Sequence, residues 1–480
     1  MDEEIIALRK NETRDLVPKV EGVTLVTYKW VYKLKKKKDG SIERYKARLV
    51  ARGFSQQYGE DYEKTFSHVK KMTSVRVVMV LAACQDKDIF IVQPPGYVSE
   101  DHPGYVCKLR KALYGLKQAP RAWYGKIAEY LQFCGYFASD SDSSLFIKKK
   151  GELHVLILLY VDDMIIAGNS GEEVARPRAE LAIWFEMKDL GELHHFLGLE
   201  VERKESDILV SQRGYADRIV QRFGMREGNS SSTPLDVGIK LRRDEGRILP
   251  DPLVFRALVG SLIYLTITRS DIAYVVGRVN MYMAEPRKLH LIAARSILKY
   301  VKSTSDMGLL YGRDTGFNLH DYTDADYGGY SDDWKSTSDY VFTCGSADIS
   351  WCSKKQDFVS VSTTEAEYKA SALAAREVIW LRRLVEDVHE EVRDPTLLRG
   401  DNESVIKLAN NPVCHARTKR IEIEYHFIRE KVLEGSLVVG HVQSEENIAD
   451  IFTKPLLKGS FTRLRGLLGL VSTSHFKGEC

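Results

Sequence analysis

The stretch "ELHVLILLYVDDMIIAGNS", residues 152–170, places two adjacent aspartates inside an apolar run. The alternating apolar residues on either side predict two strands, with Asp162 and Asp163 at the turn between them. Two carboxylates held together among buried strands cost on the order of several kcal/mol unless a positive charge neutralises them. The tip is therefore a suitable place to bind a divalent ion together with a nucleoside triphosphate. A solvent-facing turn is the other interpretation, because Asp is common in turns.

Composition sets broad limits on the protein. With 480 residues, 44% of them hydrophobic and 29% charged, the chain is ordinary globular protein, long enough for roughly two to four domains. The net charge of +3 does not by itself predict nucleic-acid binding, so local basic patches must carry that inference. The seven scattered cysteines include no C-x-x-C pair, which argues against a zinc module or disulfide framework and suits a reducing compartment.

The N-terminal segment predicts an amphipathic helix that ends at Pro18, with no apolar signal peptide. No apolar run approaches the ~20 residues that a membrane span needs. We therefore expect a cytoplasmic protein without a membrane partner.

A basic, aromatic hairpin is predicted at residues 29–54, with its turn at residues 38–41. Its Lys and Arg residues alternate with Trp30, Tyr32 and Tyr45. This combination suits phosphate contact and base stacking. A solvated edge strand, protected by lysines, is the alternative.

Further along, residues 206–312 are mostly helical in pattern, with a polar linker at 228–236. From about residue 316 the pattern predicts three short strands, a long helix capped by Ser362 or Thr363, and then alternating strands and helices. The predicted fold class is therefore α/β (α+β) throughout.

Four carboxylates in this last segment each stand at the end of a predicted element: Asp324, Glu367, Asp401 and Asp450. In a compact layout of three strands followed by αβα, such ends converge on one edge of the sheet. Four acids meeting there repel one another unless divalent cations neutralise them. Two Mg²⁺ ions about 4 Å apart can then activate water and stabilise the leaving oxygen in phosphodiester cleavage. The alternative is that each acid caps a turn or forms a surface ion pair.

Several motifs in order along the chain identify a family. They are "WVYKLKKKKDGSIERYKARLVARGFSQQYGEDYEKTFSHV" (30–69), "KALYGLKQAPRAWY" (111–124), "YVDD" (160–163), "VGSLIYLTITRSDIAYVV" (259–276), "STTEAEY" (362–368), "GDN" (400–402), "HARTKRIEIEYHFIREKV" (415–432) and "IADIFTKPL" (448–456). Together they resemble a copia-type LTR retrotransposon polyprotein, without its gag, protease and integrase parts.

The resemblance implies a palm-and-fingers reverse transcriptase domain at 1–205, a helical thumb or connection at 206–315, an RNase H-like domain at 316–470 and a tail at 471–480. It also implies Mg²⁺ or Mn²⁺ as cofactor. The implied partners are an RNA template, an RNA–DNA hybrid and, if the polymerase is competent, dNTPs. An intact element would place the protein in a virus-like particle or the nucleus.

The resemblance assigns roles residue by residue. In the polymerase, Asp162 and Asp163 correspond to the palm aspartates, and Gln118 to the loop under the template–nucleotide pair. Lys46 and either Arg48 or Arg52 correspond to fingers cations near the triphosphate, and Arg121 belongs to the same nucleic-acid-binding set as Gln118.

In the RNase H part, Asp324, Glu367, Asp401 and Asp450 correspond to the metal-binding tetrad. Glu367 is preferred to Glu365 because "YKASALAA" follows it. His441 precedes Asp450 at about the spacing of the family's mobile histidine.

The chain also departs from the family. Copia-type chains carry a third palm carboxylate in a "D-V-K-x-A-F" context, but residues 81–98, "LAACQDKDIFIVQPPGYV", lack it and offer only Asp86 and Asp88 nearby. We expect an internal deletion near residues 89–92. Asp339 replaces a turn glycine, at a cost on the order of 1 kcal/mol if φ is positive. Arg14 and Leu291 stand where Trp is usual.

The sequence therefore predicts a truncated reverse transcriptase–RNase H whose polymerase is defective and whose RNase H tetrad is intact. Two alternatives remain open: a non-catalytic nucleic-acid-binding relic and an unstable pseudogene product.

Overall fold

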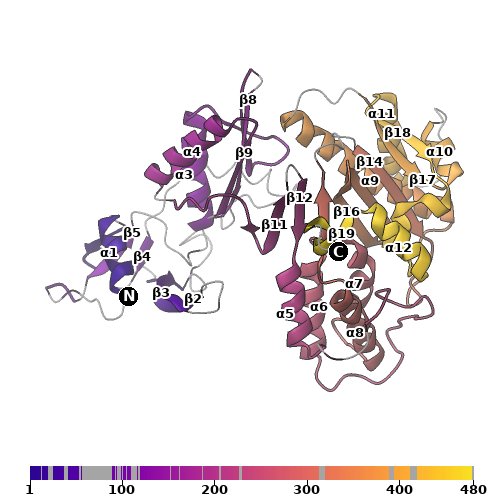
Figure 1. Ribbon diagram of the computed structural model, residues 1–480, viewed down its shortest axis with the longest axis horizontal. Coiled ribbons are helices and arrows are strands. Elements are labelled where there is room, and N and C mark those ends of the chain that lie inside the picture. The colour runs from indigo at the N-terminus through magenta and orange to yellow at the C-terminus, as the bar shows by residue number, and fades with distance from the viewer. Residues whose placement is uncertain are drawn as a thin grey trace. The chain divides into compact units, whose positions relative to one another are not determined.

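The structure is a computed structural model with mixed helices and sheets, which confirms the predicted fold class (Figure 1). The chain divides into two compact units, Met1–Asp189 and Leu190–Cys480, and each is described by itself. The described residues are 1–11, 13–19, 25–36, 42–52, 56, 89–91, 93, 99, 101–103, 105–109, 116, 119–151, 153–161, 163–185, 187–204, 207–225, 227, 230–312, 319–388, 394–410 and 419–477. None of the helices in these ranges is both long and apolar enough to cross a membrane.

The first unit begins with helix α1 (Asp2–Lys10), which is shorter than expected. The next residues form strand β1 (Arg14–Val17) instead of continuing the helix, because they pair antiparallel with β5 (Val106–Leu109). Strand β4 (Ile89–Ile91) pairs with the other edge of β5. Asp86, Asp88 and most of the stretch expected to lack the third palm carboxylate lie outside the described residues.

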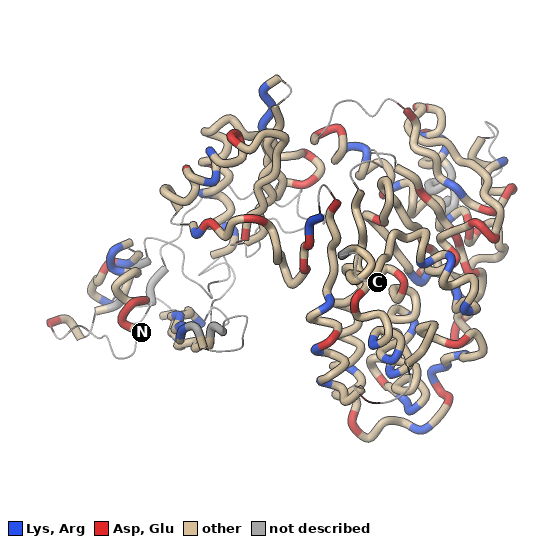
Figure 2. The backbone as a smooth tube through the Cα atoms, in the orientation of Figure 1, with Lys and Arg blue, Asp and Glu red and all other residues tan. Residues whose placement is uncertain are grey.

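The predicted basic hairpin is confirmed as β2 (Tyr28–Lys36) and β3 (Ile42–Ala51), which pair antiparallel. Lys and Arg recur along both strands (Figure 2). Leu49 and Ala51 are buried with Ile5, Val26 and Leu116 in a small core. The hairpin is thus fixed at its base, while Tyr32 and Tyr45 are 67% and 77% exposed.

The two strands predicted around the aspartate pair are confirmed as β8 (Leu153–Tyr160) and β9 (Asp163–Gly168). They belong to a sheet of order β6-β7-β8-β9, with β6 at Phe137–Ala138 and β7 at Leu145–Lys150. Because Val155, Ile157 and Leu159 alternate along β8, their side chains are buried on one face. Helices α3 (Ala119–Phe133) and α4 (Gly171–Trp184) contribute to the same core (Figure 1).

The second unit contains two five-stranded sheets. The first, the connection sheet, has the order β10-β11-β12-β13-β19. Its strands are β10 (His195–Phe196), β11 (Leu199–Lys204), β12 (Asp207–Ser211), β13 (Met307–Tyr311) and β19 (Leu470–Ser472). Residues 190–205, expected with the palm, therefore lie in the second unit. Val471 and Ser472, expected in a tail, pair with β13.

The predicted helical segment contains α5 (Arg213–Arg222), α6 (Leu253–Leu265), the 3-10 turn η2 (Ser270–Ile272), α7 (Ala273–Asn280) and α8 (Lys288–Ser303). Its core residues, such as Phe255 and Ile297, cluster with Phe452 and Leu464 from the C-terminal region. This core spans the predicted boundary at residue 315, so the helical segment and the C-terminal region pack together within the second unit.

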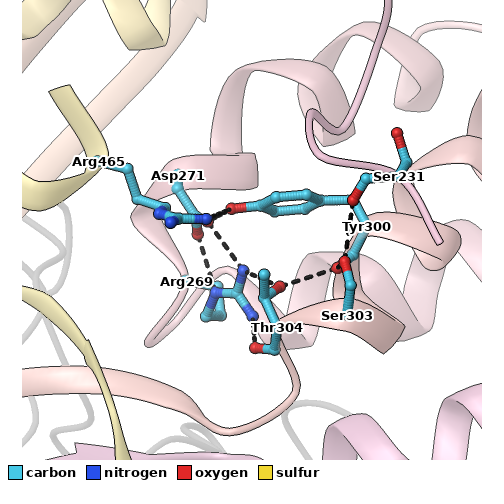
Figure 3. A network of polar contacts seen from close by, with 7 residues as sticks. All are labelled: Ser231, Arg269, Asp271, Tyr300, Ser303, Thr304 and Arg465. Atoms are coloured by element: carbon cyan, nitrogen blue, oxygen red, sulfur yellow. Dashed lines mark hydrogen bonds and ion pairs between the residues drawn. The ribbon is translucent and has the colours of Figure 1, made fainter. Parts of the chain in front are cut away.

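A buried polar network joins the same two regions (Figure 3). The Arg269 guanidinium pairs with Asp271 through two bonds of 2.9 and 2.8 Å. Tyr300 donates to Asp271 and accepts a 3.1 Å bond from Arg465 of α12 (Lys458–Leu467). Arg269 also donates to the Thr304 carbonyl at 2.7 Å. The buried charges are thus paired, and α12 is fixed against α8.

The second sheet, the carboxylate sheet, has the order β16-β15-β14-β17-β18. The predicted three strands are confirmed as β14 (Leu319–Asp326), β15 (Thr337–Cys344) and β16 (Ala347–Lys355), which pair antiparallel in succession. Strands β17 (Thr396–Gly400) and β18 (Leu437–His441) continue the sheet parallel to β14. The long helix is α9 (Thr363–Val388), whose Tyr368 and Ala372 pack with Phe342 and Leu398 of the sheet (Figure 1).

Helices α10 (Glu403–Asn410) and α11 (Lys419–Leu433) confirm the alternation predicted here. The 3-10 turn η4 (Ser444–Glu446), α12 and α13 (Thr473–Lys477) were not predicted. The helix expected at 447–456 is instead the 3-10 turn η5 (Ile448–Phe452). Pro455 stops this turn from continuing, because it cannot donate a backbone hydrogen bond.

Candidate metal centre

Three of the four predicted carboxylates of the second unit meet at one edge of the carboxylate sheet. Asp324 lies near the end of β14, Glu367 in the second turn of α9, and Asp401 directly after β17. One carboxylate oxygen from each lies within 4.8 Å of the others. The convergence follows from topology, because β14 and β17 are parallel neighbours and their carboxyl ends meet at the same edge.

The fourth carboxylate, Asp450, lies beside this trio rather than within it. It belongs to η5, and its Oδ1 is 2.7 Å from the Lys454 Nζ. The charge of Asp450 acts on Asp324: burial, followed by this charge, raises the pKa of Asp324 to about 7. The charges of the four predicted acids thus interact, and three of the four lie close enough together to bind one ion.

Burial dominates the electrostatics of the trio. Asp324 is only 4% exposed. Burial, followed by the charges of Asp324 and Asp401, raises the pKa of Glu367 to about 9. A metal-free cluster therefore retains protons near neutral pH, and a divalent cation would replace them. Carboxylate oxygens are the ligands that Mg²⁺ and Mn²⁺ prefer, so this donor set fits such an ion.

Three side chains that the sequence did not indicate hold this centre in place. The Thr453 hydroxyl donates to Asp324 Oδ2 at 2.7 Å, and the Ser444 hydroxyl donates to Asp401 Oδ2 at 2.8 Å. Asn447 donates to the Thr323 carbonyl at 3.2 Å. Of the three, only Thr453 had a signal in the sequence, because it follows Asp450 by three positions on a helical turn and so shares its face.

The choice of Glu367 over Glu365 has a structural basis. Glu365 accepts a 2.8 Å bond from the Val361 backbone and forms a 2.7 Å ion pair with Lys369. Ser362 in turn accepts from the Glu365 backbone. Glu365 therefore caps the start of α9, as expected of a capping box.

Asp339 is a fifth acid at the same edge, and the expected strain is absent. It pairs with Asp324 across β14 and β15 and does not have a positive φ. Its Oδ1 accepts from the Asp324 backbone at 3.0 Å, whereas its Oδ2 has no hydrogen-bond partner among the described residues. Burial, and then the charges of Asp324 and Glu367, raise the pKa of Asp339 well above its ordinary value.

His441 ends β18, is exposed and pairs with Gly400, next to Asp401. This position is at the rim of the centre. The role expected for His441 stays a prediction.

The hairpin tip of the first unit is described less completely. Asp163 begins β9 and is exposed, whereas Asp162 and Gln118 lie outside the described residues. Val161 has a φ of 52°, which a β-branched residue rarely adopts. Its carbonyl accepts a 2.6 Å bond from Trp123 Nε1, so α3 fixes the tip in this conformation.

The expected nucleic-acid-binding cations of the first unit lie on two elements. Lys46 and Arg48 are half-buried on β3, opposite Lys33 and Val31. Arg52 is exposed just beyond β3, and Arg121 is half-buried in the first turn of α3. Their expected roles are untested predictions.

Comparison with known proteins decides the family. A model described as reverse transcriptase (RNA-dependent DNA polymerase) matches residues 11–89 and 81–237. The chain is 41% identical over 489 residues to the retrovirus-related Pol polyprotein from transposon RE1 of Arabidopsis thaliana, covering 98% of this chain and 33% of that relative. It is 33% identical over 301 residues to the putative transposon Ty5-1 protein YCL074W of Saccharomyces cerevisiae, covering 62% of this chain and 98% of that relative.

The chain belongs to the copia-type retrotransposon polyproteins. This confirms the resemblance inferred from the motifs. The copia-type chain spans about a third of the length of the RE1 polyprotein and carries a reverse transcriptase domain. A solved foamy viral protease–reverse transcriptase in complex with RNA/DNA hybrid aligns at 12% identity and a TM-score of 0.44, covering 92% of this chain and 52% of that one.

Proposed function

We propose that this copia-type chain hydrolyses the RNA strand of RNA–DNA hybrids in a Mg²⁺- or Mn²⁺-dependent reaction, and that its polymerase is defective. The observation that carries the proposal is the trio Asp324, Glu367 and Asp401, whose oxygens lie within 4.8 Å of one another at a sheet edge. Partly desolvated acids at this separation repel one another without a cation.

In the proposed reaction, the four carboxylates would hold the ions, which supply an activated water and stabilise the leaving oxygen. The chain's own groups orient these ligands. Thr453 fixes one oxygen of Asp324, and Ser444 fixes one oxygen of Asp401. Such supporting hydrogen bonds set ligand direction and typically change metal affinity or activity by about 10- to 100-fold.

The defective polymerase is proposed from the first unit. The sequence lacks the family's third palm carboxylate between residues 81 and 98. The reverse transcriptase model also matches in two pieces that overlap at residues 81–89, next to residues 89–92, where we expect the deletion. Without a third ligand, Asp162 and Asp163 lack a partner for metal binding.

Nucleic-acid binding without turnover is a second candidate, and the β2–β3 hairpin favours it. Exposed Tyr32 and Tyr45 stand among Lys and Arg residues, an arrangement that suits stacking on bases and contact with phosphates. Such a relic would bind a hybrid with a steep salt dependence.

A labelled RNA–DNA hybrid tests the cleavage proposal. We expect the purified chain to cut the RNA strand with Mg²⁺ or Mn²⁺ and to stop when EDTA is added. Asp401→Asn should lose at least about a hundredfold in rate, because it removes a metal ligand. Exposed Glu403, two positions away, provides the matched control Glu403→Gln. Equal cutting by Asp401→Asn and the parent would refute the site, and binding without cutting would favour the relic.

Primer extension on an RNA template tests the polymerase proposal with the same preparation. We expect no incorporation of dNTPs above background. Sustained extension would show that another acid supplies the third ligand.

A further inference from the structure

Lys454 is the cation that the chain itself supplies to the candidate metal centre. It follows Asp450 by four positions, and its Nζ lies 2.7 Å from Asp450 Oδ1. The lysine side chain is 45% exposed, whereas that of Asp450 is 13% exposed. The ammonium group thus reaches from the solvent side onto a largely covered carboxylate.

The charge of Lys454 also acts on the trio. It opposes the effects of burial and of Asp450 on the pKa of Asp324, and it lowers the pKa of Glu367 against burial. Burial alone would lower the pKa of Lys454. However, the hydrogen bond to Asp450 and the charges of Asp324 and Asp450 raise it above its ordinary value. The Lys454 ammonium, 2.7 Å from Asp450 Oδ1, thus places a positive charge beside the trio.

The pairing divides the four acids into two groups. Oxygens of Asp324, Glu367 and Asp401 are within 4.8 Å of one another, and the trio can share one ion without disturbing Lys454. Asp450 is instead engaged with the ammonium. An ion that uses Asp450 must displace Lys454 or bind beside it against charge repulsion.

We propose that Lys454 is a positioning residue of this centre that competes with a divalent cation for Asp450, so that the trio would bind a first ion and Asp450 would bind a second one only against the ammonium charge. This inference rests on the proposed metal-dependent function. Lys454 would make the second ion bind more weakly than the carboxylates alone would allow. Its ion pair would also hold Asp450 in place while the second ion is absent.

A simpler account is a helical i,i+4 ion pair that only stabilises the turn. Such a pair would contribute only to the stability of the turn, and removing it would leave metal binding unchanged. The two accounts predict different metal titrations, because only competition couples Lys454 to the second ion.

A Mn²⁺ titration of the full chain distinguishes the two accounts. Binding is measured by calorimetry and electron paramagnetic resonance, without nucleic acid. We expect two steps in the parent chain. Lys454→Met should tighten the second step about tenfold, because it removes a like charge next to the ion, and should change the first step less, because the ammonium is paired with Asp450. Lys454→Gln, which keeps a hydrogen-bond donor for Asp450, should behave like Lys454→Met. Lys454→Arg should keep the parent affinity.

Lys458, four positions further along the chain and exposed, provides the matched control Lys458→Met, which should change neither step. Thermal melting verifies that each variant is folded. An unchanged or weaker second step in both Lys454→Met and Lys454→Gln would overturn the inference while leaving the proposed function intact. Absence of saturable Mn²⁺ binding in the parent, with the same result for Asp324→Asn, would instead overturn the proposed function.

Discussion

The edge of the carboxylate sheet and the tip of the β8–β9 hairpin both carry acids from the family's motifs, but their surroundings differ. At the sheet edge, β14, α9 and β17 each deliver one acid, and hydroxyl groups of Thr453 and Ser444 orient two of them. At the tip, Asp163 is exposed on a single hairpin. A sequence motif therefore identifies the family, whereas a metal site requires several structural elements that bring their acids together and hold them in place.

The largest expected effect separates the two regions directly. Asp324→Asn should lower hybrid cleavage by at least about a hundredfold, because it removes a buried metal ligand. Asp163→Asn should leave cleavage unchanged, because its hairpin belongs to the proposed defective polymerase. The test is to compare the rates at which the two variants cut the RNA strand at the same Mg²⁺ concentration. Equal losses would mean that the two regions act together.

A smaller effect is expected from the groups that orient the acids. Thr453→Val keeps the shape of a fully buried side chain but removes the donor to Asp324 Oδ2. Metal affinity should weaken about tenfold. A Mn²⁺ titration measures this, and exposed Thr363→Val is the control. Unchanged affinity would show that strand geometry alone positions Asp324.

The pH dependence of stability should differ between the metal-free and metal-bound chains. Asp324 and Glu367 have folded-state pKa values raised to about 7 and about 9, above those of the unfolded chain. The folded state therefore binds more protons between about pH 4 and pH 9, and stability falls as the pH rises through this window. At about 1.4 kcal/mol per pKa unit, the two shifts together set an upper bound on the order of 10 kcal/mol for this loss.

Thermal melts with EDTA from pH 5 to pH 9 measure this fall, and Mg²⁺ should reverse most of it at the alkaline end. The double variant Asp324→Asn, Glu367→Gln should show a shallower slope. A metal-free melting temperature that rises toward pH 9 would contradict the raised pKa values.

The smallest expected effect lies at the hairpin tip. Trp123→Phe removes the bond from Trp123 Nε1 to the Val161 carbonyl and should destabilise the first unit by about 1 kcal/mol. Hybrid cleavage should not change. Denaturant unfolding of the variant, followed with a probe in the first unit, measures the loss. A parallel loss of cleavage would show that the tip supports the second unit's chemistry.

Local patterns predicted much of this molecule. The alternation in residues 152–170 predicted β8 and β9, and the turn residues at 38–41 predicted the β2–β3 hairpin. Four acids at element ends predicted a common edge, because the order of strands and helices leaves few topologies. Asp324, Glu367 and Asp401 meet there.

Long-range pairing was beyond the sequence. The alignment of β1 with β5 depends on residues about 90 positions apart, so the first residues were expected to continue a helix. Asp339 was judged by its turn propensity, but its burial beside Asp324 depends on the register of β14 and β15. The hydroxyl groups of Thr453 and Ser444 were missed because a hydroxyl residue near an acid is common and its direction depends on the fold.

The pairing of β13 with β19 sets a constraint on synthesis. Leu309 is made roughly 160 residues before its partner Leu470, so the connection sheet cannot be completed while the nascent chain is still short. During that interval the edge of β13 is open to other strands. Translation that stops before Leu470 would thus release a chain whose β13 edge is unpaired and prone to aggregation.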